Sequence, residues 1–79
     1  MKAEVYSKSN CPFCVKAKAL LTQKGIEFEE LDAVALRDQL IERVTKDTGN
    51  APRTVPQIYL DGQYIGGYDQ LAAHFANQA

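Results

Sequence analysis

Two cysteines separated by two residues constrain this chain more than any other feature of its sequence. Cys11 and Cys14 follow a short strand-like segment and open a stretch rich in Ala, Leu and Lys, which are good helix formers. Pro12 lies between them, at a position that the first turn of a helix tolerates. A disulfide across so short a loop would remove little entropy from the unfolded chain, so holding the fold together is not its main value. We therefore expect the pair to serve chemistry at the start of a helix.

The rest of the chain predicts an α/β fold with the order β-α-β-α-β-β-α. Strands are expected over residues 2–6, 26–31, 55–60 and 63–65, and helices over residues 12–24, 33–45 and 68–77. The segment 46–53 has the composition of a loop, and Asp61-Gly62 is a hairpin signal. A parallel βαβ unit followed by an antiparallel hairpin gives a four-stranded mixed sheet flanked by helices. Five residues are expected in the core or on the sheet: Tyr6, Phe28, Ile58, Tyr59 and Phe75.

Length and charge narrow the class of protein. The 79 residues are enough for one domain, which we expect to span residues 1–79. Nine Lys and Arg residues against ten Asp and Glu residues give a net charge of −1, which argues against a binder of nucleic acid or of anionic membranes. No apolar run reaches the length of about 20 residues that a membrane span needs, and the N-terminus lacks the pattern of a secretory signal. We expect a soluble, cytoplasmic monomer.

The positions of the two thiols predict different roles for them. Unpaired backbone N–H groups and the positive end of the helix dipole stabilise a thiolate, so Cys11 should ionise more readily than a free thiol. Lys8, three residues earlier, adds positive charge nearby. Cys14 lies one turn inside the helix, where we expect it to be more buried and less ionised. Cys11 is then the attacking thiol of a disulfide exchange, and Cys14 resolves the mixed disulfide that forms.

Two other interpretations of the cysteine pair stay open at this point. A structural zinc needs about four ligands, and beyond the two cysteines the chain offers only His74 and carboxylates, so no metal is expected. Two inert core thiols are the other alternative, because cysteine is often buried, although seldom with this spacing at a helix start. A C-x-x-C motif near a βαβ unit is typical of a redox centre, which is the interpretation we favour.

Three motifs in order along the chain resemble those of the glutaredoxin family, in its small dithiol form. Cys11-Pro12-Phe13-Cys14 resembles the C-P-Y-C active site with Phe in place of Tyr, and Thr54-Val55-Pro56-Gln57 resembles the T-V-P-Q segment. Ile65-Gly66-Gly67-Tyr68-Asp69 resembles the I-G-G-x-D segment of the family. The resemblance covers about residues 5–71. It implies a thioredoxin-like fold and glutathione as the reductant.

The resemblance also implies a binding site for glutathione. Lys8 resembles the family lysine that contacts the glycine carboxylate, and Arg37 aligns loosely with a family residue that reaches the same group. Each could instead be an exposed, solvated cation, and Arg53 either joins them or is only a loop charge. Pro56 resembles the family's cis-proline, which leaves the Val55 backbone free to pair with the peptide backbone of glutathione.

The other end of glutathione is expected at the start of the last helix. Gly66-Gly67 puts flexible backbone at a helix N-terminus, which suits the γ-glutamyl carboxylate. Asp69 either binds the γ-glutamyl ammonium or only caps the helix, and Gln70 stands where the family often has a further Asp. Three further residues are expected to line the groove: Phe13, Thr54 and Tyr68. Tyr68 could instead simply begin the helix.

The sequence thus predicts a glutathione-dependent thiol–disulfide oxidoreductase that reduces protein disulfides and glutathionylated proteins. The family suggests ribonucleotide reductase as one client, with roles in electron transport and cell redox homeostasis. One rival is a related redoxin reduced by thioredoxin reductase, which tends to lack a segment like 66–69. Another is a binding module in which Cys11 and glutathione from two chains hold an iron–sulfur cluster, although relatives of that kind mostly carry one cysteine. A purely structural adaptor is disfavoured by the thiol pair.

Overall fold

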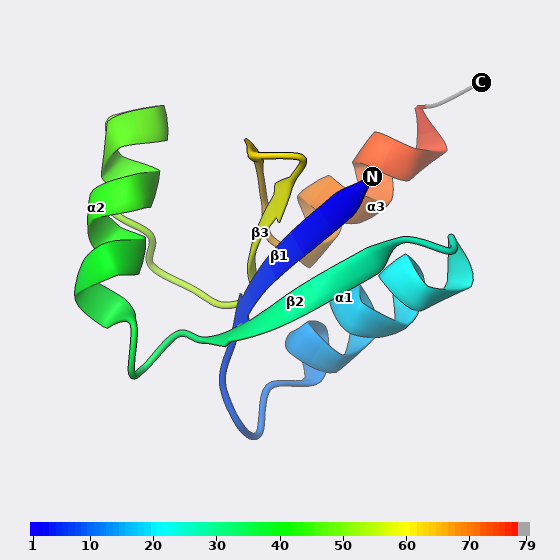
Figure 1. Ribbon diagram of the computed structural model, residues 1–79, viewed down its shortest axis with the longest axis horizontal. Coiled ribbons are helices and arrows are strands. Elements are labelled where there is room, and N and C mark those ends of the chain that lie inside the picture. Colours follow the sequence, from blue (N-terminus) through cyan, green and yellow to red (C-terminus); the bar gives the residue numbers. More distant parts are fainter. Residues whose placement is uncertain (78–79) are drawn as a thin grey trace.

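The elements of the fold follow one another in the expected order, β-α-β-α-β-β-α (Figure 1). The computed structural model describes residues 1–77, so the last two positions of the expected domain, 78–79, lie outside the described residues. The strands are β1 (Lys2–Ser7), β2 (Glu27–Asp32), β3 (Gln57–Leu60) and β4 (Gln63–Gly66). The helices are α1 (Pro12–Gln23), α2 (Arg37–Thr48) and α3 (Tyr68–Ala76).

The four strands form one mixed sheet in the order β2-β1-β3-β4. β1 and β2 are parallel, with Lys2 opposite Glu27, and α1 connects them, which gives the expected βαβ unit. β3 runs antiparallel to β1, with Val5 opposite Ile58, and β4 runs antiparallel to β3. The sheet prediction is therefore confirmed, including the parallel unit followed by the hairpin. Among residues 1–77, no helix combines the length and apolar character needed to cross a bilayer.

Three of the predicted boundaries are wrong for local reasons. The second helix begins at Arg37 rather than at residue 33, because the Asp32 carboxylate accepts hydrogen bonds from the N–H groups of Val34 and Ala35 and holds residues 33–36 in turns. The same helix continues to Thr48 and ends at a left-handed glycine, so the loop predicted from residue 46 is shorter. The third strand begins at Gln57, after Pro56, whose ring nitrogen cannot donate to a strand ladder.

Each face of the sheet has its own hydrophobic cluster, because alternate residues of a strand point to opposite sides. Ile58 is fully buried under α1 and α3, in a cluster completed by Ala3, Val5, Ala17, Leu21, Leu60 and Leu71. Tyr6 and Tyr59 face α2, in a cluster completed by Ala33, Leu40 and Val44. Figure 1 shows α1 and α3 on one side of the sheet and α2 on the other. The predicted burial of these three residues is confirmed, whereas Phe28 and Phe75 are half-buried at the margin.

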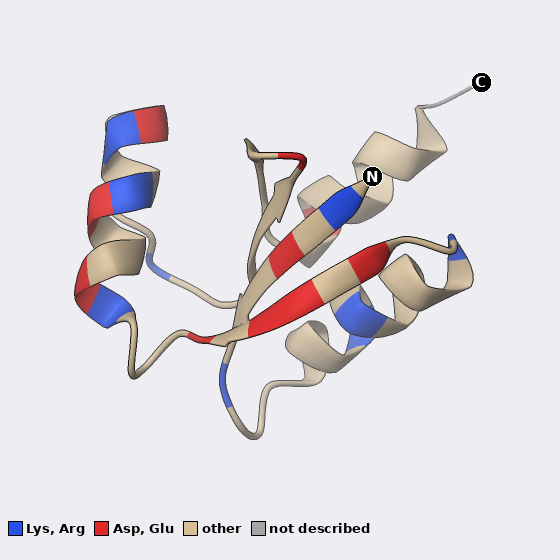
Figure 2. Ribbon diagram, in the orientation of Figure 1, with Lys and Arg blue, Asp and Glu red and all other residues tan. Residues whose placement is uncertain are grey.

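Strand β2 forms one edge of the sheet and is strongly acidic. Figure 2 shows the acidic residues following one another along its ribbon. Four of its six residues carry a carboxylate, namely Glu27, Glu29, Glu30 and Asp32. All four are exposed, which agrees with the alternation of apolar and acidic residues that predicted this strand.

Helix α2 is attached to the sheet through a polar and aromatic cluster centred on Arg43. Its guanidinium donates hydrogen bonds of 2.9 and 3.0 Å to the two carboxylate oxygens of Glu4, and one of 3.0 Å to the Tyr6 hydroxyl. The same group lies 3.7 Å from the centre of the Tyr59 ring, and the Tyr59 hydroxyl donates to Asp47 at 2.6 Å. The hydrogen bonds and the charge of Arg43 hold the pKa of the Glu4 carboxyl below its ordinary value.

We expect Arg43→Met to lower the free energy of unfolding by about 1.5–3 kcal/mol at pH 7, since hydrogen bonds to charged groups are lost from a half-buried site. Because the pKa of Glu4 is depressed in the folded state, its contribution is present above its unfolded pKa and is lost as the pH falls through the folded one. The difference between variant and parent should therefore shrink when urea unfolding is repeated at pH 3. Lys46→Met, at an exposed cation of the same helix, is the control and should cost under about 0.5 kcal/mol. An equal loss from Arg43→Met at both pH values would contradict this role of the pair.

Candidate active site

The two cysteines form a disulfide at the N-terminus of α1. Asn10 takes a left-handed backbone conformation in the loop after β1, and Pro12 then begins the helix. Cys11 is the N-cap residue, and its sulfur accepts a hydrogen bond of 3.1 Å from the backbone N–H of Cys14. The two Cα atoms are 5.2 Å apart, within the usual range for a disulfide. A helix N-terminal N–H group is thus directed at the Cys11 sulfur, as the sequence predicts for a stabilised thiolate.

The two cysteines are both buried, but they differ in residual exposure. Cys11 is 8% exposed and Cys14 only 1% exposed. Cys14 is drawn inward because it lies on the face of α1 that also carries Ala17 and Leu21, both of which are fully buried. The predicted order of burial is confirmed, and it leaves Cys11 as the sulfur that a second molecule reaches first.

The segment that carries the proline lies against the Cys11 sulfur although it is distant in sequence. The Val55–Pro56 peptide bond is cis, as the resemblance implies. The Val55 carbonyl oxygen lies 3.8 Å from Cys11 Sγ, across 44 residues of chain. Thr54 is exposed and Val55 half-buried, so the backbone here lines the surface next to the disulfide.

The start of α3 adjoins the same place. The rings of Phe13 and Tyr68 lie 6.1 Å apart, and the Lys16 ammonium lies 5.1 Å from the centre of the Phe13 ring. A Cβ atom on Gly67 would lie 3.6 Å from the carbonyl oxygen of Pro56. The three motifs found in the sequence therefore meet around Cys11, as a shared groove requires.

One contact at the start of α3 was not foreseen from the sequence. The side-chain oxygen of Gln70 accepts a hydrogen bond of 3.0 Å from the backbone N–H of Gly67. That N–H is one of the donors expected to meet the γ-glutamyl carboxylate, so a ligand there competes with the Gln70 amide. Asp69 is exposed in the first turn of α3. The three-residue spacing of a capping box was the signal that could have revealed the Gln70 contact.

Three cations approach the groove from its other end. A hollow of about 250 Å³ is lined by Lys8, Arg37, Arg53, Thr54 and Val55 among other residues. Lys8, Arg37 and Arg53 are exposed, so their charged groups are available to an anion. Arg37 aligns only loosely with the family in sequence, but in the structure it lies beside the same hollow as Lys8.

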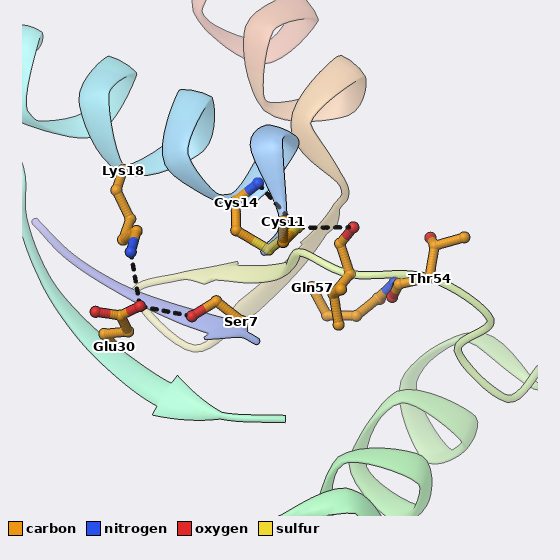
Figure 3. The surroundings of a disulfide bond; sticks show 8 residues. Ser7, Cys11, Cys14, Lys18, Glu30, Thr54 and Gln57 are labelled. Carbon is orange, nitrogen blue, oxygen red and sulfur yellow. Dashed lines mark hydrogen bonds and ion pairs between the residues drawn. A yellow bond between two sulfur atoms is a disulfide. The ribbon is translucent and has the colours of Figure 1, made fainter. Parts of the chain in front are cut away.

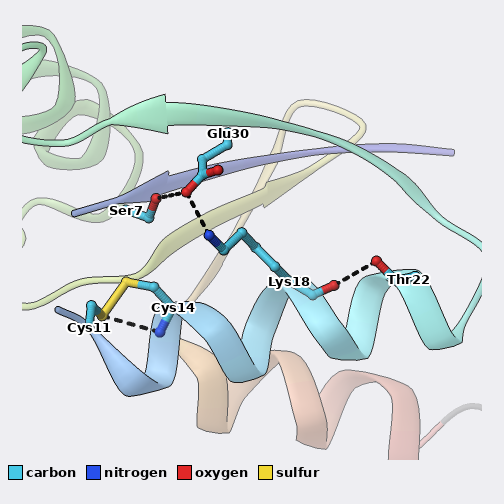
Figure 4. Close-up of polar contacts among 6 residues, drawn as sticks. All are labelled: Ser7, Cys11, Cys14, Lys18, Thr22 and Glu30. Atoms are coloured by element: carbon cyan, nitrogen blue, oxygen red, sulfur yellow. Dashed lines mark hydrogen bonds and ion pairs between the residues drawn. A yellow bond between two sulfur atoms is a disulfide. The ribbon is translucent and has the colours of Figure 1, made fainter. Parts of the chain in front are cut away.

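On the opposite side of the disulfide lies a polar cluster that the sequence did not reveal (Figures 3 and 4). The Glu30 carboxylate accepts hydrogen bonds of 2.7 Å from both the Lys18 ammonium and the Ser7 hydroxyl. These donors hold the pKa of the Glu30 carboxyl below its ordinary value. Together with Cys11 and Cys14, the cluster lines a hollow of about 740 Å³. The sequence signal that could have placed Lys18 beside the disulfide was its spacing from Cys14, which lies one helical turn earlier.

The chemistry available to this site is reversible dithiol–disulfide exchange. The two sulfurs are already bonded to one another, and Cys11 keeps more exposed surface than Cys14. Within residues 1–77, no group of three or more His, Cys, Asp or Glu side chains is arranged to hold a metal ion. A cysteine pair at a helix N-terminus, beside a cis-proline segment on a mixed sheet, defines a thiol–disulfide oxidoreductase.

The comparisons with known proteins give the family. The glutaredoxin family model matches residues 3–65, and the chain belongs to the glutaredoxin family. Members of this family are glutathione-dependent thiol–disulfide oxidoreductases with a thioredoxin-like fold, so the predicted fold class and activity are confirmed. The Cys11–Cys14 pair fits the dithiol motif of the family.

Individual relatives agree with this assignment. Glutaredoxin 3 of Escherichia coli K12 is 45% identical over 73 residues, which cover 89% of this chain and 81% of that protein. The solved structure of reduced Escherichia coli glutaredoxin is similar with a TM-score of 0.72 and 33% identity, over 99% of this chain and 96% of the other. The buckwheat glutaredoxin–glutathione complex gives a TM-score of 0.77 at 27% identity, over 95% of this chain and 68% of the other.

After reduction, iodoacetamide at pH 7 should label Cys11 well before Cys14, because Cys11 is the more exposed of the two residues and its sulfur receives the helix N–H. Peptide mass spectrometry over a time course measures the two rates. Lys8→Ala should slow the labelling of Cys11 roughly twofold, the size of an exposed charge effect. Lys24→Ala, at the far end of α1, is the matched control and should leave the rate unchanged. Faster labelling of Cys14 would reverse the assignment of the two thiols.

Proposed function

We propose that Cys11 is the nucleophile and Cys14 the resolving thiol of this enzyme. The observation that carries the assignment is the position of Cys11, whose sulfur lies 3.8 Å from the Val55 carbonyl oxygen and which keeps 8% of its surface exposed, while Cys14 keeps only 1%. A substrate lying along the Val55 segment therefore meets the sulfur of Cys11 first. Cys14 can reach only a partner already attached to Cys11.

The reaction runs through two disulfide exchanges. The Cys11 thiolate attacks a client disulfide, forms a mixed disulfide and releases one client thiolate. Cys14 then attacks Cys11 of the mixed disulfide, which frees the second client thiol and leaves the Cys11–Cys14 disulfide. Two glutathione molecules restore the dithiol: the first forms a mixed disulfide with Cys11, and the second attacks it and leaves as glutathione disulfide. Two electrons pass from glutathione to the client.

Glutathione is placed across the groove with its cysteine next to Cys11. The Val55 backbone pairs with the glutathione peptide backbone, and Lys8 and Arg37 hold the glycine carboxylate in the hollow that they share. The convergence of these cations on one hollow supports the placement, because paired cations suit a carboxylate. Arg53 lines the same hollow and adds to its positive charge.

The γ-glutamyl end is placed at the start of α3. Asp69 takes the ammonium group, and the backbone around Gly67 takes the carboxylate in competition with Gln70. Phe13 and Tyr68 pack as one wall of the groove, and Thr54 forms part of the opposite side.

The cellular role follows from the same chemistry. Residues 1–79 act as a single domain and as a monomer, in the reducing cytoplasm where glutathione can regenerate the thiols. The clients are proteins with disulfides and glutathionylated proteins, with ribonucleotide reductase among those that the family suggests. Electron transport to such clients and maintenance of cell redox balance are the proposed roles. No metal is required for any step of the cycle.

Cys14→Ser should keep substantial removal of glutathione from glutathionylated substrates but lose most reduction of protein disulfides, because the second reaction needs a neighbouring thiol to release the client. Cys11→Ser, the matched variant, should abolish both. The assay follows NADPH oxidation with glutathione and glutathione reductase. Thioredoxin reductase in place of that pair should not drive the wild-type reaction, and if it did so efficiently, the glutathione assignment would be wrong. Loss of both activities in folded Cys14→Ser would show that Cys14 shares in the first attack.

Asp69→Asn should raise the apparent KM for glutathione by roughly threefold to fivefold, because the charge that faces the ammonium is removed while the side chain keeps its size and shape. The rate with a small disulfide that contains no glutathione should change little. Asp61→Asn, at an exposed acid of the β3–β4 turn, is the control. Equal effects of Asp69→Asn on both substrates would indicate that Asp69 serves the helix rather than the ligand.

A further inference from the structure

Gln57 makes two short hydrogen bonds immediately behind the segment that faces the disulfide. It is the first residue of β3 and only 4% exposed. Its side-chain Nε2 donates to the Thr54 carbonyl at 2.7 Å, and Figure 3 shows its side chain reaching toward Thr54. Its Oε1 accepts from the Tyr64 hydroxyl at 2.6 Å. The carboxamide therefore links strand β4 to the residue that precedes Val55.

The bond from Gln57 to Thr54 spans the two residues that matter most for substrate binding. Val55 and Pro56 lie between its ends, and the Val55 oxygen is the one that lies 3.8 Å from Cys11 Sγ. Residues 53–56 lie outside the strand, so the sheet ladder does not hold them in place. A buried side-chain bond across the segment limits the directions in which the Val55 backbone groups can point.

Tyr64 determines which end of the carboxamide faces Thr54. A carbonyl only accepts, so the NH₂ end must face Thr54, and the oxygen end is then left needing a donor. The Tyr64 hydroxyl supplies that donor, and its ring is held edge-on to the Tyr59 ring at a centroid distance of 5.3 Å. Burial raises the pKa of Tyr64 above its ordinary value, so the hydroxyl keeps its proton at neutral pH.

We propose that Gln57 and Tyr64 are positioning residues for glutathione: through the bonds Tyr64–Gln57–Thr54 they hold the Val55 backbone in the direction that pairs with the glutathione peptide. This inference rests on the proposed placement of glutathione along Val55. Neither side chain touches the sulfur of Cys11 in this arrangement, and both act through the backbone of the segment. They therefore govern binding of glutathione more than the intrinsic reactivity of Cys11.

Tyr64→Phe tests the proposal while keeping the ring. It should raise the KM for glutathione roughly fivefold, which corresponds to the loss of one buried hydrogen bond, and should leave kcat within about twofold. Gln57→Met removes both bonds and should raise the KM further. Tyr59→Phe is the matched control, because it deletes a buried phenol from the adjacent ring whose hydroxyl bonds to Asp47 of α2 instead. It should cost stability but leave the KM unchanged.

A second measurement separates positioning from stability. In Tyr64→Phe, the NMR amide signals of Thr54 and Val55 should shift, binding of S-methylglutathione should weaken by the same factor as the KM, and alkylation of Cys11 should keep its rate. The proposal would be overturned if Tyr64→Phe left the KM for glutathione unchanged, or if Tyr64→Phe and Tyr59→Phe raised it equally. Neither result would contradict the glutathione-dependent activity of the wild-type enzyme. A wild-type enzyme without saturable dependence on glutathione would instead refute the placement of glutathione itself. If Gln57→Met fails to fold, Tyr64→Phe decides alone.

Discussion

The burial of one face of α1 against the sheet determines where the two sulfur atoms of this protein lie. Ala17 and Leu21 are completely inaccessible, and they pack with Val5 and Ile58 in the cluster between helix and sheet. Since these contacts leave the helix no freedom to rotate, Cys14 on the same face is drawn inside. The N-cap residue Cys11, one turn earlier, is also buried but keeps 8% of its surface exposed, against 1% for Cys14. The difference in exposure between two chemically identical thiols is thus a consequence of apolar packing, and the proposed difference in their roles rests on it.

The two sides of the sheet are held by different kinds of interaction, and the site draws on both. The side that carries α1 and α3 is packed with aliphatic residues, which give the cysteines and the start of α3 a rigid support. On the other side, α2 is attached through Arg43, Tyr59 and their polar partners. The aromatic contact from Tyr59 to Tyr64 continues toward the segment that contains Val55. The two sets of hydrogen bonds stay separate, since the Tyr59 hydroxyl bonds to Asp47 of α2 and the Tyr64 hydroxyl to Gln57 of β3.

Most of the fold and the centre of the site could be predicted from the sequence, because both depend on patterns of residues that are close together in the chain. The C-x-x-C spacing at a helix start, the alternation along the strands and the turn at Asp61-Gly62 each act over a few residues. What the sequence could not show are contacts that depend on how distant strands align. The Lys18–Glu30 pair and the Tyr64–Gln57 bond require the register of the sheet. The second helix was wrongly predicted to begin at residue 33, because the Asp32 side chain accepts hydrogen bonds from the following backbone and competes with helix formation there.

The acidic strand β2 has a further consequence for the behaviour of this protein in a crowded solution. An edge strand offers unpaired backbone groups to any other exposed strand, and this is a common route to aggregation. Two copies meeting along β2 would bring their rows of carboxylates together, so the encounter is repelled before backbone hydrogen bonds can form. The charges that make β2 recognisable in the sequence thereby protect this edge of the sheet from pairing. The repulsion weakens in acid, which protonates the carboxylates, and in concentrated salt, which screens them.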